Sequence, residues 1–145
     1  MLYQTAFSLI LLQIVATMTF IMVPSHIDRP VIEGDEFIPS LIRFIYSLDS
    51  GYNLLPSLHV AHSTVVTLVC FNAKHFLRYA VLACTILICC STVFIKQHFI
   101  IDIPFGLLYA FVSYYVASSL VRALEKPLEL QEEINEETEW TTVSK

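Results

Sequence analysis

Two histidines and one aspartate have the types and the spacing that acid–base or nucleophilic chemistry requires. In the stretch STVFIKQHFIID, residues 91–102, His98 and Asp102 are four residues apart, so on a helix they would share one face. A carboxylate bonded to one imidazole nitrogen fixes the tautomer and leaves the other nitrogen basic. This is the orienting half of a nucleophile or of a general base. The same pattern also fits a structural pair that caps a helix start.

The second histidine follows a helix-start signal. Pro56 and Ser57 are typical of the beginning of a helix, and Ser57 is expected as its N-cap or a first-turn residue. His59 would then project from the first turn, where free backbone N–H groups attract phosphate. A histidine that faces His98 across a bound anion is what acid–base assistance of phosphoryl transfer requires. Alone, His59 would read as an ordinary interfacial residue.

A metal site is an alternative use of the same side chains. His59, His98 and Asp102 could together ligate a metal ion. Arg29 and Lys96 are expected near them, however, and these cations favour an anion over a metal cation. The four cysteines form no zinc-like cluster and are expected to pack as small apolar side chains.

The elements that must position these residues read as membrane helices. Of the 145 residues, 56% are hydrophobic and 14% are charged, whereas soluble domains carry about a quarter charged residues. A membrane-spanning helix needs about 20 largely apolar residues. We therefore predict an all-α integral membrane bundle with four spans, of which the first is a retained helix and not a signal peptide. The spans are expected over about residues 3–23, 56–73, 79–96 and 100–121.

A short helix is expected in the loop between the first two spans. In EFIPSLIRFIYSL, residues 36–48, the helical spacing puts five apolar side chains on one face and polar side chains on the other. This pattern fits a helix lying in the membrane interface. It fits equally a lid packed on the bundle. The apolar face consists of Phe37, Leu41, Phe44, Ile45 and Leu48.

Basic residues predict the orientation of the chain. Lys74 and Arg78 lie between the second and third spans, and Arg122 and Lys126 follow the fourth. Short loops rich in Lys and Arg stay cytoplasmic, so we expect both termini inside and the loop 24–55 outside. Residues 1–123 would form the membrane domain, with 124–145 an acidic, solvated and partly disordered cytoplasmic tail. The net charge of −5 comes mostly from this tail, and no nucleic-acid partner is expected.

Three motifs together resemble the type 2 phosphatidic acid phosphatase superfamily. They are Arg29-Pro30, PSLH at 56–59 and SxxxxxxHxxxD at 91–102. The stretches NLLPSLHVAHS and STVFIKQHFIID are most similar to the branch that includes inositol phosphorylceramide synthase-like and related bacterial membrane proteins. The resemblance covers about residues 24–108.

The resemblance implies a role for each matched residue. His98 matches the nucleophile that takes the phosphoryl group as a phosphohistidine, and Asp102 matches the carboxylate that orients it. His59 matches the general acid that protonates the leaving oxygen and then helps to activate the acceptor. Ser57 and Arg29 match phosphate-binding positions. The resemblance implies no metal and no cofactor.

The chain departs from the family pattern in three ways. The first motif often reads KxxxxxxRP, and Met22 stands at the lysine position; the third often reads SRxxxxxHxxxD, and Thr92 stands at the arginine position. We infer that Lys96, two residues before His98, supplies one of the missing cationic contacts. Family members commonly have more spans than the four expected here. The chain would then be a short member, a truncated product or one part of a homo-oligomer.

We therefore expect a metal-independent lipid phosphatase or phosphotransferase at the outer membrane face, with membrane lipids as its surroundings and a phosphorylated lipid as its substrate. Phosphatidic acid, a polyprenyl diphosphate and a phosphoinositol lipid all fit. The alternative is a truncated, non-catalytic member that binds lipid phosphate or acts as a membrane interaction subunit. A transporter subunit fits less well, because its charged residues would be distributed through the depth of the membrane.

Overall fold

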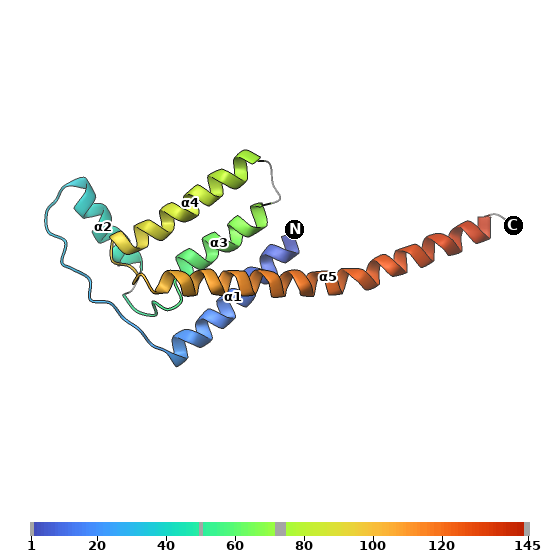
Figure 1. Ribbon diagram of the computed structural model, residues 1–145, viewed down its shortest axis with the longest axis horizontal. Helices are drawn as coiled ribbons and strands as arrows, with labels where there is room; N and C mark the ends of the chain where they lie inside the picture. Colours follow the sequence, from blue (N-terminus) through green and yellow to red (C-terminus); the bar gives the residue numbers. More distant parts are fainter. Residues whose placement is uncertain (1, 50, 72–74, 144–145) are drawn as a thin grey trace.

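The computed structural model describes residues 2–49, 51–71 and 75–143, and within these ranges the ordered elements are helices (Figure 1). The all-α prediction is confirmed. The only pairing of extended backbone in the described ranges is an isolated bridge between His26 and Tyr52. The five helices are α1 (Leu2–Met22), α2 (Phe37–Leu48), α3 (Leu58–Cys70), α4 (His75–Phe94) and α5 (Asp102–Val143).

Three of these helices are long and apolar enough to cross a membrane. They are α1, the Phe76–Phe94 part of α4 and the Asp102–Pro127 part of α5. Only 17%, 11% and 28% of their apolar windows are buried inside the protein, so most of this apolar surface faces outward. Outward-facing apolar helices with internally satisfied backbone are what a lipid environment requires.

The second predicted span is shorter than expected. The sequence predicts a span over 56–73, but α3 has 13 residues, which at 1.5 Å per residue is about 20 Å. The hydrocarbon core of a bilayer is about 30 Å thick. The chain therefore has three long candidate spans, with α2 and α3 as shorter apolar helices. Lys74, which contributed to the predicted orientation, lies outside the described residues.

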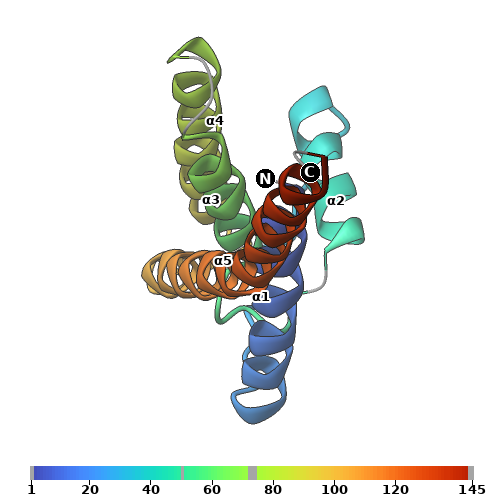
Figure 2. The ribbon, with the colours of Figure 1, turned by 90° about the vertical axis from the view of Figure 1, so that its right-hand side faces the viewer.

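Helices α1 and α5 pack antiparallel, and α3 packs against α1, α4 and α5. Gln4 Nε2 donates to Ser118 Oγ at 2.6 Å near one end, and the Thr19 and Tyr109 hydroxyls are 2.7 Å apart near the other. Figures 1 and 2 both show α3 alongside α4, with α1 crossing α5. The small core between these helices consists of Leu12, Ala61, Val65 and Ala110.

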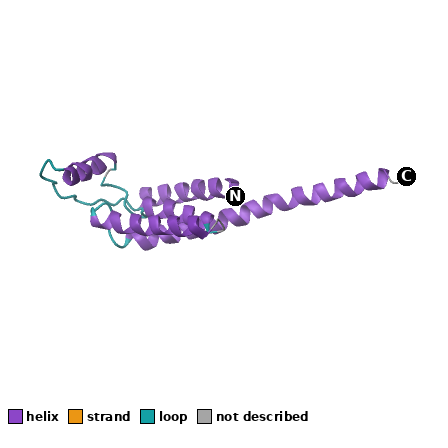
Figure 3. Cartoon of the chain, turned by 90° about the horizontal axis from the view of Figure 1, so that it is seen from above, coloured by secondary structure: helices purple, strands orange, loops and turns teal. Residues whose placement is uncertain are grey.

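Helix α2 confirms the short helix predicted over 36–48, and it lies apart from the other four helices (Figure 3). None of its residues is buried. Its apolar side chains Phe37, Phe44 and Leu48 are 77%, 58% and 72% exposed. The apolar face is therefore not a lid buried on the bundle, and its exposure fits a helix lying in the membrane interface.

Helix α5 continues far beyond its apolar part. The sequence predicts a partly disordered tail from residue 124, whereas the helix runs on through Pro127 to Val143 and leaves the bundle (Figure 1). Glu, Leu, Gln and Lys are strong helix formers, and the tail contains no glycine to end the helix. The acidic segment thus extends a membrane helix instead of ending it.

Gly106 allows α5 to approach the start of α3 closely. A Cβ at this position would lie 2.8 Å from the carbonyl oxygen of Ser57 and 3.1 Å from the Cβ of Val60. Small residues permit this kind of approach between membrane helices. The approach matters because Ser57 and Val60 flank His59 on α3, while Asp102 begins α5.

We predict that Gly106→Ala destabilises the protein. Overpacking costs about 1–3 kcal/mol, which outweighs the gain of about 1 kcal/mol in helix propensity from glycine to alanine. The midpoint of thermal unfolding in detergent micelles should fall. Ser119→Ala, an exposed change on the same helix, should leave the midpoint unchanged or raise it. A midpoint for Gly106→Ala equal to that of wild type would show that the close approach is not required.

Candidate functional site

Ser57 joins the start of α3 to the start of α5. It is the N-cap that the sequence predicts, because its hydroxyl accepts the N–H of Val60 at 3.5 Å and its carbonyl accepts the N–H of Ala61 at 3.0 Å. Its own N–H donates to the carbonyl of Asp102 at 3.4 Å. Ser57 is fully buried. The structure therefore places Ser57 in the support of the site, with its hydroxyl committed to the helix cap.

The turn after α4 brings His98 into the protein. Lys96 adopts a positive φ of 50°, which is the left-handed conformation that commonly ends a helix. The N–H of Lys96 donates to the carbonyl of Val93, and the N–H groups of Gln97 and His98 both donate to that of Thr92. This is the Schellman pattern of a helix C-terminus. Thr92, at the position of the missing arginine, is 2% exposed and anchors the turn through its backbone.

His98 and Asp102 form the pair that their spacing predicts. His98 Nδ1 lies 3.3 Å from Asp102 Oδ2, and the side chains are 6% and 3% exposed. The same Oδ2 accepts the backbone N–H of Phe99 at 2.8 Å. The imidazole is thereby fixed through Nδ1, which leaves Nε2 as the nitrogen available for chemistry.

Burial keeps the His98 imidazole in its neutral form. Loss of solvent lowers the pKa of His98 below its ordinary value of 6.5, and the neighbouring His59 lowers it further. The carboxylate of Asp102 acts in the opposite direction but does not reverse the shift. An unprotonated imidazole has a free electron pair and can act as a nucleophile or a base.

His59 faces His98 from the first turn of α3. The two ring centroids are 5.7 Å apart, and the ring planes are inclined by 67°. His59 is exposed, whereas His98 is buried. The structure therefore brings together two imidazoles from segments 39 residues apart in the sequence, one open to solvent and one held by a carboxylate.

A cavity of about 180 Å³ lies between these two histidines and the segment that precedes α3. It is smaller than a pocket for a whole drug-sized ligand, which usually has about 300–1,000 Å³. It therefore suits a compact polar group. Its lining residues are Phe20, Asp49, Tyr52, Asn53, Leu54, Leu58, His59 and His98.

Asp49 is a lining residue that the sequence analysis did not identify. Asp49 and Asp102 are the only acidic residues from position 37 to position 124, and this isolation is the signal that could have marked it. Its Oδ2 accepts Arg29 Nη2 at 3.2 Å and Gln97 Nε2 at 3.3 Å. The two carboxylates of the membrane domain thus both lie beside His98.

Arg29 lies behind Asp49 instead of in the lining of the cavity. Its Nη1 donates to the carbonyls of Tyr46 and Asp49, and its guanidinium carbon lies 4.7 Å from the centre of the Tyr46 ring. Its side chain is only 11% exposed. In the described structure, Arg29 reaches the cavity through its ion pair with Asp49.

Lys96 lies on the opposite side of His98. It lines a second, larger cavity of about 660 Å³, to which His98 also contributes. The remaining lining side chains are mainly apolar and come from the end of α4 and the turn before α5; they are Ile27, Asp28, Val93, Phe99, Ile100 and Ile101. His98 therefore separates a small polar cavity from a larger apolar one.

The alternative of a metal site gains no support from the geometry. Within the described ranges, no group of three or more histidine, cysteine, aspartate or glutamate side chains is placed to hold a metal ion. His62, one turn after His59, is half-buried and does not line the histidine cavity in the described part of the chain.

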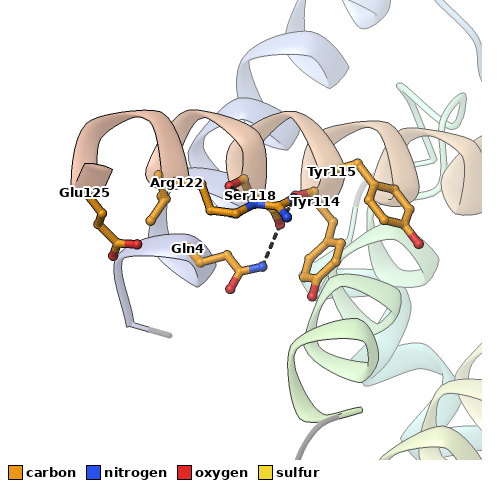
Figure 4. A pocket seen from close by; sticks show the side chains of 7 residues that line it. Gln4, Tyr114, Tyr115, Ser118, Arg122 and Glu125 are labelled. Atoms are coloured by element: carbon orange, nitrogen blue, oxygen red, sulfur yellow. Dashed lines mark hydrogen bonds between the residues drawn. The ribbon is translucent and has the colours of Figure 1, made fainter. Parts of the chain in front are cut away.

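Another polar pocket, of about 330 Å³, lies at the far end of α1 and α5 (Figure 4). Its side chains are Gln4, Tyr114, Tyr115, Ser118, Val121, Arg122 and Glu125. Gln4 bonds to Ser118, and Arg122 Nε donates to the carbonyl of Ser118 at 3.2 Å. This pocket has no histidine and no paired nucleophile, so the histidine cavity is the better candidate for chemistry.

Comparisons with family models, with curated proteins and with solved structures found no match to this chain.

We predict that His98 titrates below pH 6.5, and that Asp102→Asn lowers its pKa further because the carboxylate no longer favours the imidazolium. NMR titration of histidine-labelled protein in micelles would measure both values. Since the unfolded imidazole binds a proton more readily, stability should fall as the pH drops from 6.5 towards the folded pKa. A His98 pKa at or above 6.5 would mean that the carboxylate outweighs burial.

Proposed function

We propose that the chain is a membrane lipid phosphatase or phosphotransferase that works through a phosphohistidine at His98. The observation that supports this most is the buried His98–Asp102 pair, 3.3 Å apart, with the exposed His59 ring facing it at 5.7 Å. An oriented nucleophile and a solvent-facing acid–base group on two sides of one cavity are the parts that two-step phosphoryl transfer requires. The resemblance of the three motifs to the type 2 phosphatidic acid phosphatases agrees with this proposal.

In the first step, Nε2 of His98 attacks the phosphorus of a phosphate ester. The N–P bond forms as the bond from phosphorus to the leaving oxygen breaks, and His59 gives that oxygen a proton. In the second step, water or an alcohol attacks the phosphorus and gives its proton to His59. The N–P bond then breaks, and His98 returns to its neutral form. Asp102 holds the imidazole through Nδ1 during both steps.

The negative charge of the transferring group needs fixed positive partners, which in other phosphoryl transferases include metal ions. Here the candidates are Lys96, Arg29 and the backbone N–H groups at the start of α3. Lys96 and His98 border the same cavity, so the ammonium group of Lys96 has access to a phosphate bound at His98.

A lipid substrate fits the surroundings of the site. The small cavity accommodates a phosphate group, while exposed apolar side chains beside His98 offer a path for hydrocarbon; Ile100 is 74% and Ile101 59% exposed. The site lies at the same end of the bundle as α2, whose exposed apolar face suits the membrane interface. From the basic residues of the opposite loops, we place this end on the extracytoplasmic side. The acceptor, water or an alcohol, decides between hydrolysis and transfer.

A non-catalytic role is the second candidate, and two observations favour it. Arg29 is engaged by Asp49, and the hydroxyl of Ser57 is committed to the cap of α3. With three long spans among the described helices, the chain could be one part of a homo-oligomer or a lipid-phosphate-binding subunit. Turnover that depends on His98 distinguishes the two candidates.

We predict that purified protein in lipid micelles releases phosphate from phosphatidic acid or a polyprenyl diphosphate, and that His98→Ala abolishes the release. EDTA should leave the activity intact, and an acid-labile phosphohistidine should appear on rapid quenching. His62→Ala is the matched control, because His62 does not line the cavity in the described structure. Transfer between lipids should be assayed beside release. Absence of both from folded protein would favour the non-catalytic role.

We also predict that His59→Ala slows the first step more for a poor leaving group than for a good one. General acid catalysis contributes about 10²–10⁴-fold, and a nitrophenolate leaves without a proton. The variant should therefore lose at least a hundredfold in kcat/KM on phosphatidic acid but much less on p-nitrophenyl phosphate. Equal losses on both substrates would assign His59 to binding instead of proton transfer.

A further inference from the structure

Asp49 is a carboxylate in the lining of the cavity that contains His59 and His98. It is the C-cap of α2, and its backbone N–H donates to the carbonyl of Ile45 at 3.2 Å. The side chain is 34% exposed, so it has room to rotate towards solvent. A fixed negative charge here would oppose the binding of a phosphate between the histidines.

Two donors hold the Asp49 carboxylate through one oxygen. Arg29 Nη2 lies 3.2 Å and Gln97 Nε2 3.3 Å from Oδ2. A guanidinium and a neighbouring amide N–H are donors that a phosphate oxygen would also take. Asp49 therefore uses donors that suit the proposed ligand.

Arg29 keeps its position by contacts that do not involve this carboxylate group. Its Nη1 donates to the backbone carbonyls of Tyr46 and Asp49, and its guanidinium lies over the Tyr46 ring at 4.7 Å. These contacts would persist if the Asp49 side chain rotated away. Rotation would release Nη2 while the guanidinium stayed in place, so the carboxylate occupies Arg29 more than it positions it.

We propose that the Asp49 carboxylate is an internal competitor of the substrate phosphate, bound to Arg29 until a phosphate monoester displaces it. The inference rests on the proposed function, because it takes the histidine cavity as the phosphate site. The exchange breaks no covalent bond: Asp49 rotates to solvent, and a phosphate oxygen accepts from Arg29. A phosphate dianion carries more charge than a carboxylate, and Arg binds both in the same geometry. The exchange also gives Arg29 access to the substrate.

The test is Asp49→Asn, which keeps the size of the side chain and removes its charge. We expect the variant to bind inorganic phosphate about tenfold more tightly than wild type, which corresponds to about 1.4 kcal/mol, measured by titration calorimetry in micelles. A parallel assay with phosphatidic acid should show a lower KM. The gain should appear with inorganic phosphate alone, because the competition concerns the phosphate group and not the lipid tail. A gain confined to the lipid would overturn the proposal.

Two further variants guard the result. Asp35→Asn is the matched control, because Asp35 lies in the same outer loop, is fully exposed and pairs with Arg43 at 3.7 Å; its phosphate affinity should equal that of wild type. Gln97→Met removes one of the two donors to Asp49 and leaves Arg29 unchanged. It should give a smaller gain in affinity, and it keeps the proposal testable if Asp49→Asn does not fold.

The outcomes separate this proposal from the proposed function. Unchanged or weaker phosphate binding by Asp49→Asn and Gln97→Met would overturn the competition and make Asp49 a residue that positions Arg29. Phosphate release that depends on His98 would survive that result. Absence of both phosphate binding and His98-dependent release from every folded variant would overturn the proposed function itself.

Discussion

A single carboxylate oxygen, Oδ2 of Asp102, joins the parts of the site. It receives the N–H of Phe99 at 2.8 Å and lies 3.3 Å from His98 Nδ1, so the turn after α4 is tied to the first residue of α5. Both side chains are almost completely buried. A buried polar group left without its partner costs about 1–3 kcal/mol. The pair therefore requires the ends of α3, α4 and α5 to stay together, and this requirement shapes the whole bundle.

Close helix packing satisfies that requirement with small residues. Gly106 lets the carbonyl of Ser57 approach α5, and Ala61 and Ala110 meet in the core between α3 and α5. Hydroxyl pairs add interhelical hydrogen bonds, as between Thr67 and Thr85 at 2.8 Å. In lipid, such packing and hydrogen bonding replace the hydrophobic effect as the source of helix association. A chain with outward-facing apolar helices can thus hold a buried polar pair at one end.

Features that depend on local spacing could be predicted from the sequence. The three long helices follow from uncharged apolar runs, α2 from its periodicity, the cap of α3 from Ser57 and the pairing of His98 with Asp102 from their separation. Features that depend on tertiary contacts could not. The position of Asp49 beside the histidines is set by Arg29 and Gln97, which are 20 and 48 residues away in the sequence. For the same reason, Arg29 was expected in the site but lies behind it.

The charge balance of the site follows from this arrangement. Asp102 compensates the burial of His98 by accepting from it, whereas Asp49 faces the cavity from the end of α2, the helix least packed against the bundle. The two carboxylates thus differ in mobility: one is fixed by burial, and the other is anchored through contacts of its side chain to Arg29 and Gln97 and through the hydroxyl of Tyr46, which donates to Ile95. A site that must accept and release an anion needs a fixed group to orient its nucleophile and a movable group to exchange with the anion. Asp102 and Asp49 have these two properties.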